Sequence, residues 1–298
     1  MNLLITGGCG HIGSYIIDNI KMINNLKTTQ INSLFNSKKK NNLKFYIRDL
    51  TKQDSLKDIK KIDYVIHLAS MTNAAGSFSK KKEMYKNNLT CMKNIINFCI
   101  KKKAKLIHIS STSVYGKQTN LVDETCEKKY LKPQSPYADI KLIEEKMLKQ
   151  AKDKLRYVTF RFGTISGTSK GMRFHTAVNK FCLNAALNEP IKVYKTALNQ
   201  FRPYLALTDA FLLFKFTIEN NFFKNDIYNA LSENYTVNQI LNKIKRYKRN
   251  ISVKFVSSPI MNQLSYHVDK NKINKEGFFF RNKIETDIKN TLNLLKNL

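Results

Sequence analysis

The sequence predicts an α/β protein with a doubly wound parallel sheet and a smaller C-terminal α/β domain. Three observations lead to this class. Short apolar strands alternate with helical segments, a glycine-rich turn follows the first strand, and polar residues come directly after several strands. Strands that alternate with helices form a parallel sheet with right-handed crossovers. Ligands of such sheets bind beyond the carboxyl ends of the strands, where these polar residues are expected to gather.

The first strand, residues 2–6, leads into a turn that holds four of the ten glycines of the chain. Apolar residues then repeat at helical spacing as far as Ile23. A dinucleotide site requires this order of strand, glycine turn and helix, with the helix N-terminus facing the phosphates. We expect Gly7 to allow the tight turn, Gly10 to admit the pyrophosphate, and Gly13 to let the helix pack closely on the strand.

An acidic residue is expected about 20 positions further on, at the end of the second strand, where it would hold the adenosine ribose. The spacing points near Asn32, in a weakly strand-like segment at 30–35, and no acid stands there. An asparagine lacks the negative charge that disfavours a 2′-phosphate. The sequence therefore leaves the choice between NAD and NADP open.

The pattern continues through the first half of the chain. Strands are predicted at residues 43–50, 63–70 and from Lys105 onward, and a helix is predicted at 83–100. Asp49, Ser70 and Ser111 then fall at carboxyl ends of strands, on the same edge as the glycine turn.

Tyr137 and Lys141 stand four residues apart at the start of a predicted helix. Residues at this spacing share one helix face. An isolated pair of this kind is usually an exposed helix face, but a cofactor site next to it changes the interpretation. A nearby ammonium favours the phenolate of a tyrosine and brings it closer to acid–base work at neutral pH.

The bulk composition indicates a globular protein. Apolar residues make up 42% of the 298-residue chain, and no apolar run is long enough to span a membrane. The net charge of +30 is spread over the whole length without a nucleic-acid-binding motif, so we interpret it as solvated surface. Five cysteines without a C-x-x-C pair, scattered histidines and an N-terminus unlike a signal peptide predict a cytoplasmic protein with reduced thiols and no metal.

Several motifs in the same order resemble one family. The chain resembles the extended short-chain dehydrogenases/reductases, in the nucleotide-sugar epimerase/dehydratase branch. The resemblance implies a Rossmann-type cofactor domain. The matching residues are 6–13, Asp49–Leu50, 67–70, Asn88, 110–116, 135–141, 161–167, Arg202–Tyr204 and Asp209.

The resemblance assigns roles to particular residues. It implies three catalytic residues: Ser111 bound to the reacting sugar hydroxyl, Tyr137 as the base, and Lys141 lowering the pKa of that base. It implies that the cofactor contacts Gly7, Gly10, His11, Ile12, Gly13, Asp49, Leu50, Leu68, Ala69, Asn88, Tyr137 and Lys141. It implies that the substrate contacts Ser111 and Arg202, with Arg202 on its diphosphate. We expect Thr112, Thr164 and Arg173 to contact the substrate as well, with Arg173 on a phosphate. The resemblance also moves the missing ribose residue to positions 24–26.

Other polar residues near these motifs have simpler interpretations. His67 is expected to be a satisfied structural histidine. Tyr115 is expected to serve packing rather than chemistry.

Departures from the family pattern narrow the reaction. The 4,6-dehydratases of the family place an Asp-Glu pair after the residue that matches Ser111, and this chain has Thr112 and Ser113 there. A departing hydroxyl would lack its acid, which disfavours dehydration. We therefore expect an NAD-dependent nucleotide-sugar epimerase that works through a transient keto-sugar, in the manner of UDP-glucose 4-epimerase. The alternative is an NAD(P)-dependent nucleotide-sugar reductase or dehydrogenase, and behind it a dehydratase or a non-catalytic nucleotide- or RNA-binding protein.

The domain division follows from the motifs. Residues 1–166 are expected to form the cofactor domain. Residues 167–298 are expected to form mainly the substrate domain, with part of 200–230 returning to the first. Helices are predicted at 174–187, 235–244 and 284–295, and a strand at 191–194. We expect a homodimer that binds a nucleotide sugar and neither nucleic acid nor membrane.

Overall fold

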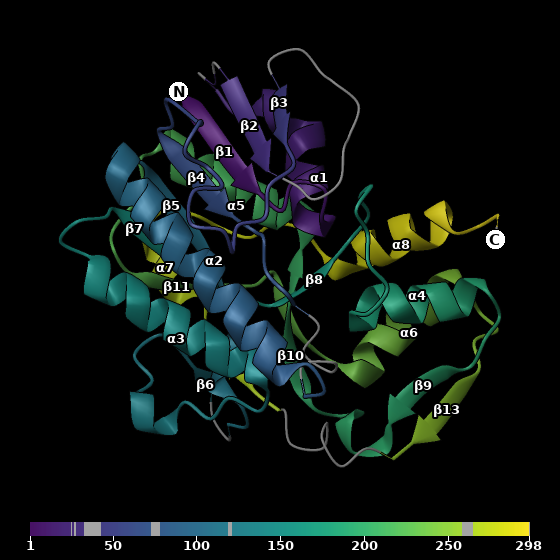
Figure 1. Cartoon of the computed structure of the whole chain (residues 1–298). Coiled ribbons are helices and arrows are strands. Elements are labelled where there is room, and N and C mark those ends of the chain that lie inside the picture. Colours follow the sequence, from purple (N-terminus) through teal and green to yellow (C-terminus); the bar gives the residue numbers. More distant parts are fainter. Residues whose placement is uncertain are drawn as a thin grey trace.

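A seven-stranded parallel sheet forms the centre of the larger half of the molecule (Figure 1). The computed structural model describes residues 1–24, 26, 28–32, 43–72, 78–118, 121–257 and 265–297. The strand order is β11-β7-β5-β4-β1-β2-β3, and every neighbouring pair is parallel. The strands are β1 (Asn2–Thr6), β2 (Thr28–Asn32), β3 (Leu43–Tyr46), β4 (Tyr64–His67), β5 (Lys105–Ser111), β7 (Tyr157–Phe162) and β11 (Ile227–Ala230).

Helices cover both faces of this sheet, as its near-continuous apolar strands require. Helices α2 (Lys81–Lys102) and α3 (Pro136–Ala151) lie in front of it in Figure 1, while α1 (His11–Asn19) and α5 (Leu207–Glu219) cover the other face. In β1, Leu3 and Ile5 join the core under α1 and α5, whereas Leu4 joins the core under α2 and α3. This alternation follows from the period of two of a strand.

The segment between α1 and β2 does not carry the ribose-binding residue where the resemblance placed it. Helix α1 ends at Asn19 and continues only as one 3₁₀ turn, η1 (Ile20–Met22), before β2 begins at Thr28. Asn24 therefore precedes the strand, and its backbone N–H donates to Glu219. The expected placement of the ribose-binding residue at positions 24–26 is wrong, because such a residue belongs at the carboxyl end of β2 and these positions precede its amino end. Asn25 lies outside the described residues. Asn32 pairs with Thr6 at the carboxyl ends of β2 and β1, where the spacing had placed it.

Other predicted boundaries shift by a few residues. The strand predicted over 43–50 ends at Tyr46, so Asp49 and Leu50 lie in the following loop. The predicted helix at 83–100 runs from Lys81 to Lys102. The helix predicted at 235–244 begins only at Val237, because Thr236 ends a strand and forms a capping box with the side chain of Gln239.

The C-terminal half forms a second layer of sheet and helices to the right of the main sheet in Figure 1. Its own apolar core joins three helices to the neighbouring strands. The strands are β8 (Thr164–Ser166), β10 (Phe201–Ala206) and β12 (Glu233–Thr236) in one sheet, and β9 (Ile191–Tyr194) with β13 (Val253–Val256) in another. The helices are α4 (Ala177–Ala186), α6 (Val237–Tyr247) and α8 (Ile284–Leu294).

The chain crosses between the two halves more than once. Helix α5 and strand β11 belong to the main sheet although they follow β10 in sequence. Asp209 in α5 is fully buried and accepts hydrogen bonds from the backbone N–H groups of Arg281 and Asn282, which fixes the start of the C-terminal segment. The remaining elements are β6 (Leu121–Val122), β14 (His267–Val268), α7 (Asn271–Lys275), η3 (Thr112–Tyr115), η4 (Lys128–Tyr130) and η5 (Lys195–Ala197). Within the described residues, no helix is both long and apolar enough to cross a membrane.

Candidate active site

Helix α3 presents Tyr137 and Lys141 at the carboxyl edge of the sheet. The helix begins cleanly because the side chain of Ser135 accepts a hydrogen bond from the N–H of Ala138, and Pro136 occupies the first helical position. Lys141 Nζ lies 5.7 Å from the centre of the Tyr137 ring. The predicted one-turn spacing therefore brings the ammonium against the phenol.

The buried carboxylate of Glu144 forms an ion pair with Lys141. Lys141 Nζ donates to Glu144 Oε2 at 2.7 Å, and His108 Nε2 on β5 lies 3.0 Å from the same oxygen. All three side chains are almost completely buried. Burial would raise the pKa of Glu144, but Lys141 and His108 lower it to about 2. Burial lowers the pKa of His108, so the imidazole is neutral and donates its Nε2 proton to the carboxylate.

The surroundings of the phenol differ from a simple lysine-activated tyrosine. Burial raises the pKa of Tyr137, Lys141 lowers it, and the carboxylate of Glu144 raises it, so the net pKa lies above its ordinary value. Burial lowers the pKa of Lys141, but Glu144 and Tyr137 outweigh that effect and keep the ammonium charged. Lys141 thus acts in the expected direction, although its effect is smaller than that of burial.

Ser111 ends β5 beside the start of α3. Its Oγ lies 2.8 Å from Ser113 Oγ and accepts a hydrogen bond from the N–H of Ser113, which opens η3. The next residue, Thr112, is buried and donates to the carbonyl of Phe162. The buried phenol of Tyr266 lies against the Thr112 hydroxyl. Burial raises the pKa of Tyr266 above its ordinary value, although Arg202 and then the Thr112 hydroxyl act to lower it. Sequence reasoning missed Tyr266, because 154 residues separate it from Thr112 and no motif marks it.

The glycine turn fits a dinucleotide. Gly7 has a φ of +68°, and a side chain there would lie 2.8 Å from the N–H of Ala69, so β4 and the turn approach as closely as backbone allows. The hydroxyl of Thr6 accepts hydrogen bonds from Leu68 and Ala69 at 3.1 and 3.2 Å, which sets those two residues beside the turn. His67 is buried with Nδ1 2.8 Å from the same hydroxyl, as expected of a structural histidine.

The start of α1 supplies the phosphate side of this site. Gly10 is the residue that precedes the helix, and His11 and Ile12 open it, with no acidic residue in the first turn. In front of the helix N-terminus, a side chain on Gly10 would lie 3.2 Å from the carbonyl of Gly7 and 4.0 Å from Nη2 of Arg173. Backbone N–H groups and the helix dipole favour an anion there.

Three other expected cofactor residues are Asp49 and Leu50, in the loop after β3, and Asn88 in α2. Asp49 is exposed and its carboxylate accepts from the N–H and hydroxyl of Thr51, which lower its pKa. Leu50 is buried behind it. Asn88 in α2 is also buried, and its amide binds both the N–H and the carbonyl of Met71. Asn88 thus fixes the loop after β4 instead of facing outward.

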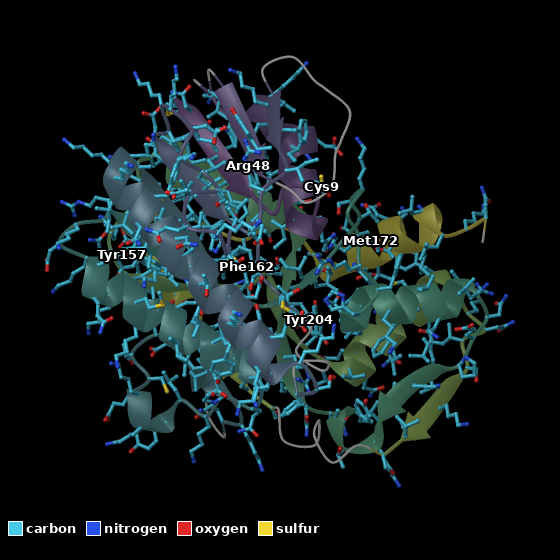
Figure 2. The ribbon with its side chains drawn as sticks, in the orientation of Figure 1. Cys9, Arg48, Tyr157, Phe162, Met172 and Tyr204 are labelled. Atoms are coloured by element: carbon cyan, nitrogen blue, oxygen red, sulfur yellow. The ribbon has the colours of Figure 1, made fainter. Side chains whose placement is uncertain are left out.

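The expected substrate residues Thr164 and Arg202 lie on the adjoining sheet. Thr164 pairs with Tyr204 where β8 and β10 run side by side, and Arg202 is half-buried at the start of β10. The phenol of Tyr204 is fully buried and has no hydrogen-bond partner in the described part of the chain. Figure 2 labels it close to Phe162, at the junction of the two sheets. Alternate residues of a strand share a face, so Arg202 and Tyr204 point the same way.

Arg173, the fifth expected substrate residue, lies elsewhere. It belongs to a loop between β8 and α4, residues 168–173, which we call the bridging loop. Arg173 Nη1 donates to Thr72 Oγ1 at 3.2 Å, and its Nη2 lies 4.0 Å from the position of a side chain on Gly10. The arginine is therefore placed over the glycine turn. No contact of the described structure joins it to Arg202.

A second buried ion pair supports the site without belonging to it. Arg161 on β7 binds Glu145 through two parallel hydrogen bonds of 2.9 and 2.7 Å, and Ser110 donates to the same carboxylate. The guanidinium lies 4.9 Å from the centre of the Tyr115 ring. Tyr115 is fully buried and donates to Asn229, which agrees with a packing role.

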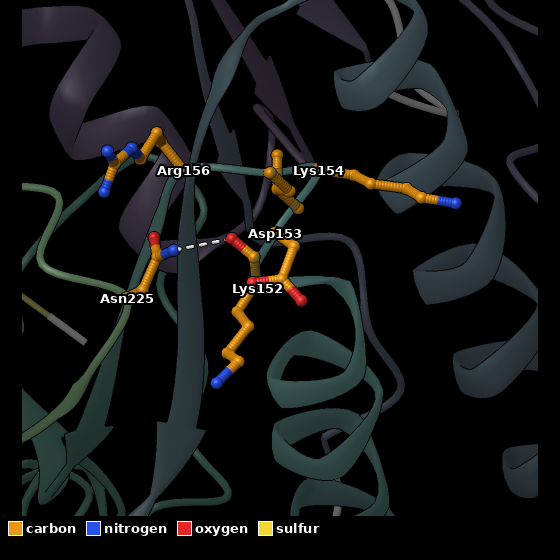
Figure 3. Close-up of a pocket in the computed structure, with 6 residues that line it drawn as sticks. Lys152, Asp153, Lys154, Arg156 and Asn225 are labelled. Atoms are coloured by element: carbon orange, nitrogen blue, oxygen red, sulfur yellow. Dashed lines mark hydrogen bonds between the residues drawn. The ribbon is translucent and has the colours of Figure 1, made fainter.

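A surface hollow lies at the other edge of the sheet (Figure 3). It has a volume of about 470 Å³ and precedes the amino ends of β7 and β11. Asn225 bridges it with a 2.9 Å hydrogen bond to the carbonyl of Lys152. The candidate active site is therefore separate from it. The lining residues are Lys152, Asp153, Lys154, Leu155, Arg156 and Asn225.

Comparison with known proteins decides the family. The model of the NAD dependent epimerase/dehydratase family matches residues 3–230. The chain belongs to this family. It is 27% identical over 280 residues to the ADP-L-glycero-D-manno-heptose-6-epimerase of Brachyspira hyodysenteriae, covering 86% of this chain and 84% of that protein. It is 33% identical over 162 residues to the UDP-glucose 4-epimerase of Yersinia enterocolitica, covering 50% of this chain and 48% of that protein.

Solved structures agree with this membership. A UDP-N-acetylglucosamine 4-epimerase from Methanobrevibacter ruminantium M1, in complex with UDP-N-acetylmuramic acid, superimposes with a TM-score of 0.85. The two sequences are 26% identical over 100% of this chain and 99% of that one. The predicted fold class and the predicted enzyme family are thus confirmed, and NAD is the cofactor of the family.

Proposed function

We propose that this chain is an NAD-dependent nucleotide-sugar epimerase, similar to UDP-glucose 4-epimerase. The observation that carries the proposal is the Tyr137–Lys141 pair, which sits at the carboxyl edge next to Ser111 with hydroxyl residues, not carboxylic acids, at positions 112 and 113. This arrangement supplies a base for a hydroxyl proton. It does not supply an acid next to Ser111 for a departing hydroxyl group.

The residues of the chain would act as follows. Ser111 binds the reacting hydroxyl of the sugar, and Tyr137 as phenolate takes its proton. Lys141, held charged by Glu144, stabilises that phenolate. When bound, NAD⁺ would supply the hydride chemistry at the same carbon. The keto-sugar rotates between the two transfers, so the proton from Tyr137 and the hydride return on the opposite face with no net redox change.

The substrate would lie between α3 and the β8–β10 sheet. Arg202 would bind its diphosphate, and Thr164 lies on the neighbouring strand of the same sheet. The unpartnered phenol of Tyr204 and the buried phenol of Tyr266 offer two further hydrogen-bonding groups there. Relatives named for UDP-linked and ADP-linked sugars support the substrate class.

Two measurements test the proposal. The purified protein should contain NAD that is released only on denaturation. It should convert UDP-glucose, UDP-N-acetylglucosamine or an ADP-heptose to its epimer with no net change in absorbance at 340 nm. A net absorbance change proportional to product would instead establish the reductase or dehydrogenase alternative.

The Tyr137→Phe variant tests the base. Loss of an acid–base group costs roughly 10²- to 10⁴-fold in turnover, and NAD binding should persist. Tyr247→Phe makes the same chemical change on an exposed helix and should retain full turnover. Equal turnover of the wild type and Tyr137→Phe would refute the role of Tyr137. The homodimer stays a prediction that sedimentation would check.

A further inference from the structure

The bridging loop is fastened to the glycine turn at several points. Ser169 Oγ donates to the carbonyl of His11 at 2.9 Å and lies 2.7 Å from Nδ1 of the same residue. The N–H of Gly171 donates to Ser14 Oγ at 2.9 Å. A side chain on Gly171 would lie 2.4 Å from the carbonyl of Cys9, so the two backbones are in direct contact. Figure 2 labels Cys9 next to Met172 at this junction.

These loop contacts bring the guanidinium of Arg173 in front of the N-terminus of α1. The backbone carbonyl of Arg173 accepts from the buried side chain of Asn179, which fixes where the side chain begins. The guanidinium then reaches across to Thr72 Oγ1, and its Nη2 lies 4.0 Å from where a side chain on Gly10 would be. It therefore spans the space between the ends of β1 and β4, where the phosphate side of the site was placed above.

The charge of this arginine is not balanced. In the described ranges no carboxylate forms an ion pair with Arg173, and the first turn of α1 contains no acid. The nearby His11 is neutral, because burial, together with Arg173 and His175, lowers its pKa to about 4. A guanidinium that lies beside a helix N-terminus favours an anion between them.

We propose that Arg173 binds the diphosphate of the cofactor rather than that of the substrate. The inference rests on the proposed function, since it requires a bound dinucleotide. Arg173 of the bridging loop would then contact one side of the cofactor diphosphate, and the glycine turn would contact the other side. Such a clamp suits an enzyme that must keep its NAD through every catalytic cycle.

Equilibrium binding to NAD-free protein tests this assignment. The Arg173→Gln variant should raise the Kd for NAD and for ADP about 10- to 100-fold, the range expected for a lost charge-assisted contact. Its Kd for adenosine, which has no phosphate, should stay within about twofold of the wild type. Arg173→Lys, which keeps the charge, should restore part of the difference. Because Arg173 is exposed, the fold should survive, and circular dichroism checks this.

Lys170→Gln is the matched control. It removes one positive charge from the same loop, but Lys170 is exposed and pairs with Asp18 at the surface, so the Kd for NAD should not change. An unchanged Kd in Arg173→Gln, or an equal loss for adenosine, would overturn the inference and leave the proposed function intact. A wild type that binds no NAD would instead refute the proposed function itself.

Discussion

Replacing Glu144 with Gln removes the carboxylate that forms an ion pair with Lys141. The residue is 1% exposed, and its Oε2 is shared between Lys141 and His108. A glutamine keeps the size and one acceptor of the side chain but not the charge. The buried ammonium of Lys141 would then lack its counter-ion. We expect the variant to fold with lower stability and with a changed dependence on pH.

The magnitude follows from the pKa of Glu144. Its carboxylate titrates at about 2 in the folded protein, against 4.5 for the ordinary group. Each pH unit of difference corresponds to about 1.36 kcal/mol, so the ionised side chain stabilises the fold by about 3 kcal/mol at pH 7. Removing one partner from a buried ion pair costs about 3–5 kcal/mol in other proteins, which agrees. Since the folded pKa is depressed, this stabilisation is complete above pH 4.5 and is lost as the pH falls toward 2.

Urea unfolding of the wild type and Glu144→Gln measures this difference. The gap in the free energy of unfolding should be about 3 kcal/mol at pH 7 and should shrink to about 1 kcal/mol at pH 3. Glu83→Gln is the control, because its ion pair with Lys80 is exposed and 3.9 Å long, and it should cost less than about 0.5 kcal/mol. A gap below 1 kcal/mol at pH 7, or one that stays constant down to pH 3, would refute the reasoning.

Three further changes have expected outcomes. Asp287→Asn should stabilise the protein by up to about 3 kcal/mol above pH 6, because burial raises the folded pKa of Asp287 to about 6 and its ionised form opposes folding. This stabilisation should disappear below pH 4, and urea unfolding at pH 4 and 8 checks it. Gly13→Ala should cost about 1–3 kcal/mol and weaken NAD binding, since its side chain would lie 2.5 Å from the carbonyl of Gly7; thermal unfolding with and without NAD checks both. Glu145→Gln should cost about 3–5 kcal/mol by leaving Arg161 buried without its partner, and equal stability to the wild type in urea would contradict this.

The features that were predictable from the sequence are those encoded by short spacing. The glycine turn, the strand and helix alternation, and the face shared by Tyr137 and Lys141 all depend on residues within one or two turns of each other. Glu144 stands only three residues beyond Lys141, so its helix face was predictable. Its partner on β5 was not, because a single histidine in an apolar strand has no spacing signal.

The part that escaped prediction depends on distant segments. Ser169 meets His11 across 158 residues of sequence, and that contact carries Arg173 to the glycine turn. Arg173 was among the expected substrate contacts, and no motif in the sequence signals the contacts that bring it to the glycine turn. Membership of a domain does not fix which ligand a loop reaches when the loop crosses to the other half.

The buried charges under α3 explain why its catalytic face is well positioned. Glu144 reaches β5 through His108, and Glu145 reaches β5 and β7 through Ser110 and Arg161. An apolar helix face tolerates small slides, because one hydrocarbon contact replaces another. A slide of one residue, about 1.5 Å, would instead leave the buried Arg161–Glu145 ion pair unmatched at about 3–5 kcal/mol and would also break the His108–Glu144 hydrogen bond. The contacts of Glu144 and Glu145 with the sheet thus hold Tyr137 and Lys141, on the same helix, in a fixed register with it.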